Sequence, residues 1–202
     1  MTFDLEQFIA DCRVALTADR SHKCVREVVA RAISDRSSVL KALGEPRCGA
    51  FQPLYRSNDL TIMNIIWAPH LMRPPHNHQM WGVIGIYTGR EDNIFWRRVP
   101  GSQGGKLEAV GAKALCEGDA EPLGPNIIHS VYNPISRLTG AIHVYGGDFL
   151  AAPGRSEWDP ETFFERPWDT ERVARQFEQA NDEVCGHQGE MTPSQACVDR
   201  RP

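Results

Sequence analysis

The stretch Pro74-Pro75-His76-Asn77-His78 carries two histidines that are separated by a single residue. Alternate residues of a β-strand project to the same side, so His76 and His78 can point together into the interior of a barrel. Two imidazoles that converge on one point are a natural pair of metal ligands, and nitrogen ligands suit iron, zinc, copper or nickel. An H-x-H pair alone does not define a metal site, so further ligands must be sought elsewhere in the chain.

A second segment, Ile127-Ile128-His129-Ser130-Val131-Tyr132-Asn133, follows Gly118-Asp119 and places a histidine within an apolar run. Burying an imidazole without a partner is unfavourable. A hydrogen-bonded core histidine would meet this condition as well as a metal ligand would. Considered together with His76 and His78, however, His129 predicts a three-histidine metal site.

Short strands are expected from about residue 51 onward, because apolar, β-branched and aromatic runs alternate there with Gly, Pro, Asn and Asp clusters. The expected strands are 60–67, 81–88, 93–99, 107–115, 127–132 and 138–145, with a flexible loop at 100–106. Many short strands without intervening helices favour a barrel or sandwich over a βαβ architecture.

Helical patterns flank this region on both sides. Apolar residues recur with helical spacing in residues 3–18, after Ser21 as far as Ile33, and at 37–43, where Gly44 and Pro46 end the pattern. Near the other end we expect a short helix at 161–165, and a longer one capped by Asp169 or Thr170 with Val173, Phe177 and Ala180 on one stripe.

The 202 residues fit a single domain. Within it we expect a helical N-terminal part (1–48), a barrel (49–150), a C-terminal helical extension (151–184) and a loosely held polar tail (185–202). The pattern does not indicate an oligomeric state.

The composition of the chain argues against some classes of binding partner. The formal net charge of −4 argues against nucleic acid or an anionic membrane as the main partner, and no run approaches the roughly 18 apolar residues of a membrane helix. The N-terminus has acids where a signal peptide has lysines, and the six cysteines form no C-x-x-C pair. We therefore expect a cytoplasmic protein in a reducing compartment.

The two histidine segments resemble the two motifs of the cupin superfamily, an H-x-H strand followed by a glycine and then G…H-x-x-x-N on a later strand. Gly89 fits the end of the first motif, while Gly118, His129 and Asn133 fit the second. This resemblance implies a mainly β fold, a cupin double-stranded β-helix (jelly-roll) barrel, here with N-terminal helices and a C-terminal helix.

One departure from the general cupin pattern makes the chain resemble a particular family within the superfamily. Most cupins have a ligand glutamate three or four residues after the second histidine, where this chain has Gly82 and Val83. A three-histidine set is similar to that of the cysteine dioxygenase family of thiol dioxygenases, especially its bacterial members, over roughly residues 50–150. The resemblance implies Fe(II) held by His76, His78 and His129, and the oxidation of a small thiol such as cysteine or 3-mercaptopropionate by O2 to its sulfinate.

The segment Gly140–Tyr145 also resembles a strand of that family. His143 and Tyr145 match its histidine and tyrosine, while Ala141 stands in place of its serine. The resemblance implies that the Tyr145 hydroxyl approaches the reacting groups and that His143 orients it. Because Gly82 and Val83 offer no cysteine for a crosslink, Tyr145 is expected to be unmodified.

The family's substrates carry a carboxylate held by an arginine, whose guanidinium matches it bidentately. Arg56 lies near the family's position for it, with Arg73, Arg97 and Arg98 as competitors, and Trp81 could form a wall of the pocket. Two alternatives stay open: a cupin oxygenase acting on a non-thiol substrate, and a non-catalytic cupin that binds a metal or a small ligand.

Overall fold

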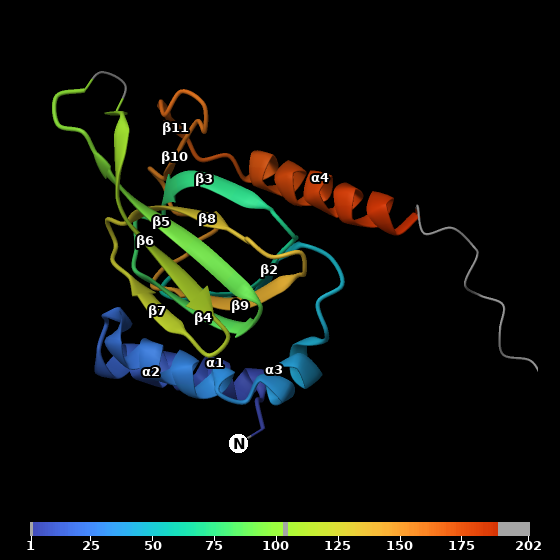
Figure 1. Ribbon diagram of the computed structural model, residues 1–202. Coiled ribbons are helices and arrows are strands. Elements are labelled where there is room, and N and C mark those ends of the chain that lie inside the picture. Colours follow the sequence, from blue (N-terminus) through green and yellow to red (C-terminus); the bar gives the residue numbers. More distant parts are fainter. Residues whose placement is uncertain (1, 103–104, 190–202) are drawn as a thin grey trace, which may run out of the picture.

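The computed structural model describes residues 2–102 and 105–189, with the side chains of 184–189 excluded. Two antiparallel β-sheets face each other at its centre, and the helices lie outside them (Figure 1). The elements in chain order are α1 (Leu5–Ala18), α2 (His22–Ile33), α3 (Arg36–Leu43), β1 (Ala50–Arg56), β2 (Thr61–Trp67), β3 (Met72–Asn77), β4 (Gly82–Thr88), β5 (Arg90–Arg98), β6 (Leu107–Cys116), β7 (Ala120–Leu123), β8 (Ile128–Tyr132), β9 (Thr139–Tyr145), β10 (Ser156–Trp158), β11 (Glu165–Pro167) and α4 (Thr170–Gly189).

The strand order identifies the architecture. The first sheet has the order β1-β2-β9-β4-β7, and the second has the order β11-β10-β3-β8-β5-β6. Strands that are far apart in the chain, such as β2 and β9 or β3 and β8, are therefore neighbours and pair antiparallel. This arrangement is a double-stranded β-helix, and the expected fold class is confirmed.

The N-terminal helices cover the outer face of the first sheet. Asp4 and Ser21 cap α1 and α2 as acceptors of the Gln7 and Lys23 backbone N–H groups. The buried face of α2 packs on β4, and the approach is close, since a Cβ atom added at Gly85 would lie 2.4 Å from Val29 Cγ1. Figure 1 shows α1 and α2 beneath β4 and β7. Alternate residues of β4 and β9 thus face the helices, and the others face the barrel interior.

The C-terminal helix closes another part of the core. Asp169 caps α4 by accepting the backbone N–H groups of Glu171 and Arg172. The expected stripe of Val173, Phe177 and Ala180 is buried. Phe177 stacks on Trp67 of β2 with ring centroids 5.6 Å apart, so α4 is anchored to the first sheet.

Two expectations about the C-terminal part need correction. Residues 161–165 form no helix, because the Asp159 carboxylate accepts the Glu161 and Thr162 N–H groups in a turn, and Phe163 has a φ of 54°. In addition, α4 continues to Gly189, beyond the expected end at 184, while residues 190–202 of the expected tail lie outside the described part of the chain. Among the described helices, none is both long and apolar enough to cross a membrane.

Candidate metal centre

The structure brings the three predicted histidines together. His76 lies near the end of β3, His78 just beyond it, and His129 on β8, where it is the ladder partner of His76. One nitrogen from each ring lies within 4.8 Å of the others, and all three residues are buried. These side chains can hold a metal ion, as the spacing of the motifs predicted.

The sequence around the ligands fixes which ring nitrogen faces inward. A proline has no backbone N–H group to donate to a neighbouring strand. The pairing of β3 with β8 accordingly shifts in register between Arg73 and His76, across Pro74 and Pro75. The Nδ1 of His76 lies 3.0 Å from the Pro74 carbonyl oxygen, and that of His129 lies 2.6 Å from Asn93 Oδ1. As hydrogen-bond donors, these Nδ1–H groups leave both Nε2 atoms with lone pairs for a metal.

A test of fit comes from His78. Its Nε2 lies 3.1 Å from His129 Nε2, and its Nδ1 has no hydrogen-bond partner among the described residues. Because the Nε2 of His129 has a lone pair and no proton, a cation that binds to both Nε2 atoms would satisfy these two facing, buried nitrogens. The donor set therefore fits a divalent transition metal.

Electrostatics keeps these ligands neutral. Burial lowers the pKa of His76 and His78 well below the ordinary value, and a proton on nearby His129 would lower both pKa values further. Burial lowers the pKa of His129 to about 4. Neutral imidazoles are the metal-binding form. Because the grouped ligands are histidines alone, a bound dication would keep its full charge at this site.

Acid is expected to destabilise the metal-free protein as the pH falls from 6.5 towards about 4, the ordinary and the folded-state pKa of His129. Over this interval the unfolded state binds the proton that the folded state excludes, so the free energy of unfolding falls with pH. For His129 alone the loss reaches about 3 kcal/mol. Urea unfolding across this range measures it, and a His129→Gln variant with an equally steep profile would contradict the assignment.

The predicted tyrosine and histidine also lie at the centre. The hydroxyl of Tyr145 lies 3.1 Å from His143 Nδ1, and its ring meets that of His78 edge-on, with centroids 5.0 Å apart. Burial raises the pKa of Tyr145, so the hydroxyl keeps its proton at neutral pH. A Cβ atom added at Gly82 would lie 3.3 Å from the Tyr145 ring, so Tyr145 occupies the space towards which a side chain at 82 would extend.

A buried carboxylate that the sequence analysis did not single out, Glu91, lies behind this pair. Its Oε2 accepts from Trp67 Nε1 at 2.6 Å and lies 3.5 Å from His143 Nε2, while its Oε1 accepts from Asn93 Nδ2 at 2.9 Å. Burial would raise the pKa of Glu91, but His143 and Asn93 together hold it below the ordinary value. His143 thus has a carboxylate partner although Ala141 offers no hydroxyl. Strand alternation from Asn93 back to Glu91 was the available signal.

Two buried guanidinium groups flank the histidines. Arg155 lies over the Phe149 and Trp168 rings, 3.9 and 3.7 Å from their centroids. Arg73 lies 5.3 Å from the Trp168 centroid and 3.4 Å from Glu157 Oε2. Within the described chain, Arg73 Nη1 and Arg155 Nε and Nη2 lack hydrogen-bond partners. Burial lowers the pKa of each arginine to about 10, so both stay charged at neutral pH.

Arg155 and Trp168 connect the histidines with a surface cavity. Trp168 has its ring centroid 5.6 Å from that of His76. Together with Arg155, Ser156 and Arg166 it also lines a cavity of about 450 Å³. The side chains of Arg155 and Trp168 therefore lie between this cavity and the metal centre. Arg73 was one competing position for the substrate arginine, whereas Arg155 lies in a segment without a recognisable pattern.

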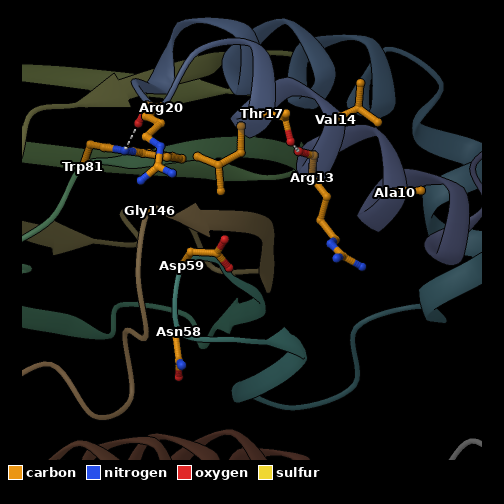
Figure 2. A pocket seen from close by; sticks show the side chains of 10 residues that line it. Ala10, Arg13, Val14, Thr17, Arg20, Asn58, Asp59, Trp81 and Gly146 are labelled. Atoms are coloured by element: carbon orange, nitrogen blue, oxygen red, sulfur yellow. Dashed lines mark hydrogen bonds between the residues drawn. The ribbon is translucent and has the colours of Figure 1, made fainter.

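The structure does not bring Arg56 or Trp81 to the histidines. Arg56, at the end of the edge strand β1, is half exposed and uses Nε and Nη2 to bind both carboxylate oxygens of Asp148, at 2.8 and 2.9 Å. Trp81 donates to the Arg20 carbonyl oxygen and lines a cavity of about 720 Å³ between α1 and the turn that precedes β2 (Figure 2). The other competitors, Arg97 and Arg98, pair with exposed Glu108 and Glu165.

Comparison with known proteins finds likenesses to solved structures. No protein-family model matches the chain. Similar solved structures include an RmlC-like cupin family protein with a double-stranded β-helix fold from Methanocaldococcus jannaschii (13% identity, 53% of this chain and 87% of that one, TM-score 0.44). Another is an uncharacterized conserved protein with a double-stranded β-helix domain from Klebsiella pneumoniae (14%, 52% and 83%, TM-score 0.38). A third is oxalate decarboxylase from Bacillus subtilis (15%, 64% and 31%, TM-score 0.38). These are likenesses of fold, and they assign no activity to the present chain.

Proposed function

We propose that this protein is a non-haem Fe(II)-dependent dioxygenase that oxidises a small, carboxylate-bearing thiol to its sulfinate with O2. The observation that carries the proposal is the pairing of three buried neutral histidines with two buried arginines, whose side chains keep N–H groups without a hydrogen-bond partner among the described residues. The reaction balances as RSH + O2 → RSO2H, with both oxygen atoms transferred to sulfur and the acidic proton released at neutral pH.

The neutral ligand set favours a thiol substrate. Fe(II) bound by three imidazoles would keep its full +2 charge, lower the pKa of a bound thiol and bring the thiolate and dioxygen together. His76, His78 and His129 contribute by remaining unprotonated in a buried site. A thiolate then supplies the negative charge that a carboxylate ligand supplies in other cupins.

Arg155 and Arg73 are proposed to hold the substrate carboxylate. A guanidinium donates charge-assisted hydrogen bonds in a fork that matches a carboxylate. In the part of the chain that the structure describes, two donor nitrogens of Arg155 and one of Arg73 have no hydrogen-bond partner. Both guanidinium groups lie beside Trp168, which contacts His76. A substrate that places its carboxylate at these arginines and its thiol at the histidines has to span only the space beside Trp168. This favours a compact molecule such as cysteine or 3-mercaptopropionate.

Tyr145→Phe is expected to lower kcat about tenfold, the effect of losing one hydrogen bond to the reacting groups. Metal affinity should be unchanged, because Tyr145 is not among the grouped nitrogen ligands. Steady-state oxygen consumption and iron content measure the two effects. An unchanged kcat would assign Tyr145 a packing role against Phe149, on which it stacks.

A reducing cytoplasm is part of the proposal. Cys12, Cys24, Cys48 and Cys116 are free thiols in the described part of the chain. Such a compartment would also keep a small thiol substrate reduced.

An oxygen-electrode assay with the Fe(II)-loaded protein tests the proposed function. The panel comprises cysteine, 3-mercaptopropionate, a thiol amine without a carboxylate, and a diketone. We expect oxygen uptake with the first two and an equal amount of sulfinate. Uptake with the diketone alone would favour an oxygenase of non-thiol substrates, and no uptake at full iron occupancy would favour a non-catalytic cupin.

A further inference from the structure

We infer that Glu91 is a positioning residue that sets the hydrogen-bonding state of both halves of the site, His129 through Asn93 and Tyr145 through His143. The part that concerns Tyr145 rests on the proposed function, whereas the part that concerns His129 rests on metal binding alone. Glu91 is fully buried near the start of β5, and its carboxylate faces three donor groups.

The first half is a chain of hydrogen bonds with one possible direction. An ionised carboxylate only accepts, so Asn93 must turn its amide nitrogen to Glu91 and its oxygen to His129, as observed at 2.9 and 2.6 Å. The oxygen of Asn93 in turn requires a proton on His129 Nδ1. Glu91 thereby leaves His129 Nε2 unprotonated and available as a metal ligand.

The second half depends on charge rather than on a hydrogen bond. The Nε2 of His143 lies 3.5 Å from Glu91 Oε2 and forms no hydrogen bond with any described residue. The negative carboxylate favours a ring proton on Nε2, the nitrogen that faces it, and this arrangement leaves a lone pair on Nδ1. That lone pair accepts from the Tyr145 hydroxyl at 3.1 Å. The phenolic oxygen then has its own lone pairs directed away from His143. Trp67, which donates to the same carboxylate oxygen, fixes the carboxylate in place.

The substitution Glu91→Gln would break this pattern, because an amide has one oxygen and one NH2 group where the carboxylate has two acceptors. With the new amide oxygen turned to Trp67 and His143, the new NH2 group would face the NH2 group of Asn93. Asn93 could relieve the clash by rotating, but its amide nitrogen would then face His129 Nδ1. His129 would have to move its proton to Nε2, the nitrogen that the metal requires.

The test uses the full chain, with Glu91→Gln compared with Asp92→Asn. Asp92 is the next residue of β5 and pairs with half-exposed Arg90, so its variant controls for the loss of one carboxylate. Metal affinity is measured by titrating the metal-free protein with Fe(II) under anaerobic conditions. We expect Glu91→Gln to weaken affinity about 10- to 100-fold, as loss of a ligand's supporting hydrogen bonds does. Asp92→Asn should match the native protein.

A second readout and a rescue variant separate positioning from loss of fold. Side-chain ¹⁵N NMR of the metal-free protein should show His129 protonated at Nδ1 and His143 at Nε2, with the His129 tautomer changed in Glu91→Gln. The double variant, Glu91→Gln with Asn93→Asp, restores every donor–acceptor pair, since the new carboxylate at position 93 accepts from both His129 and the new amide at position 91. It should recover metal affinity and the native tautomer.

Failure of rescue in a folded double variant, or unchanged affinity and tautomers in Glu91→Gln, would overturn the inference. These readouts involve no thiol. Absence of thiol oxidation with the expected tautomers would therefore reject the proposed function and leave the His129 part of the inference in place.

Discussion

His129→Ala is expected to abolish tight Fe(II) binding. The Nε2 of His129 faces His78 Nε2 at 3.1 Å, and its Nδ1 is hydrogen-bonded to Asn93. Replacing His129 therefore removes one of the three proposed ligands, the one that Asn93 holds in place opposite His78. Two imidazoles remain, on one short segment. Iron content after anaerobic loading and desalting measures the loss, and turnover should disappear with it.

The control for this variant is His22→Ala, at the start of α2 and outside the grouped histidines. It should retain one iron per chain. If His129→Ala retained stoichiometric iron while remaining folded, the three-histidine centre would be rejected, and the burial of His129 would have to be explained by its hydrogen bond to Asn93 alone.

Arg155→Ala is expected to raise the KM for a carboxylate-bearing thiol about 100-fold, which corresponds to losing charge-assisted hydrogen bonds in a buried site. A thiol without a carboxylate should show little change in KM, because it makes no such bonds. Initial rates over a range of thiol concentrations measure both values. Iron content should be unchanged, since Arg155 is not a ligand.

Arg56→Ala is the matched control, because Arg56 is the arginine that the sequence resemblance favoured and that the structure pairs with Asp148 on the surface. We expect its KM to equal that of the native protein. A large increase in KM for Arg56→Ala, together with none for Arg155→Ala, would reject the proposed carboxylate site.

The grouping of the three histidines could be predicted from the sequence because local rules determine where these side chains lie. His76 and His78 share one side of the chain by strand alternation, and the apolar run around His129 identified a buried strand. The same rule put His143 and Tyr145 on one face of β9, where the structure has them. The core strands and the stripe on α4 likewise follow from short-range periodicity.

The residues around the ligands were harder to predict because they meet through long-range contacts. Glu91 on β5 lies beside His143 on β9, a strand of the other sheet. Arg155 comes from the segment between β9 and β10, which has no repeating pattern. The position of Arg56 along the chain favours it as the substrate arginine, but Asp148, 92 positions later, binds its guanidinium. Which arginine faces a site depends on partners that spacing does not reveal.

X-ray absorption at the iron edge, with and without thiol under anaerobic conditions, tests directly whether a thiol binds to iron at the three histidines. We expect one iron per chain with imidazole nitrogen neighbours that are lost in His129→Ala, and a new sulfur neighbour when 3-mercaptopropionate is added. Iron that keeps a nitrogen and oxygen environment at saturating thiol would contradict thiol oxidation at this centre.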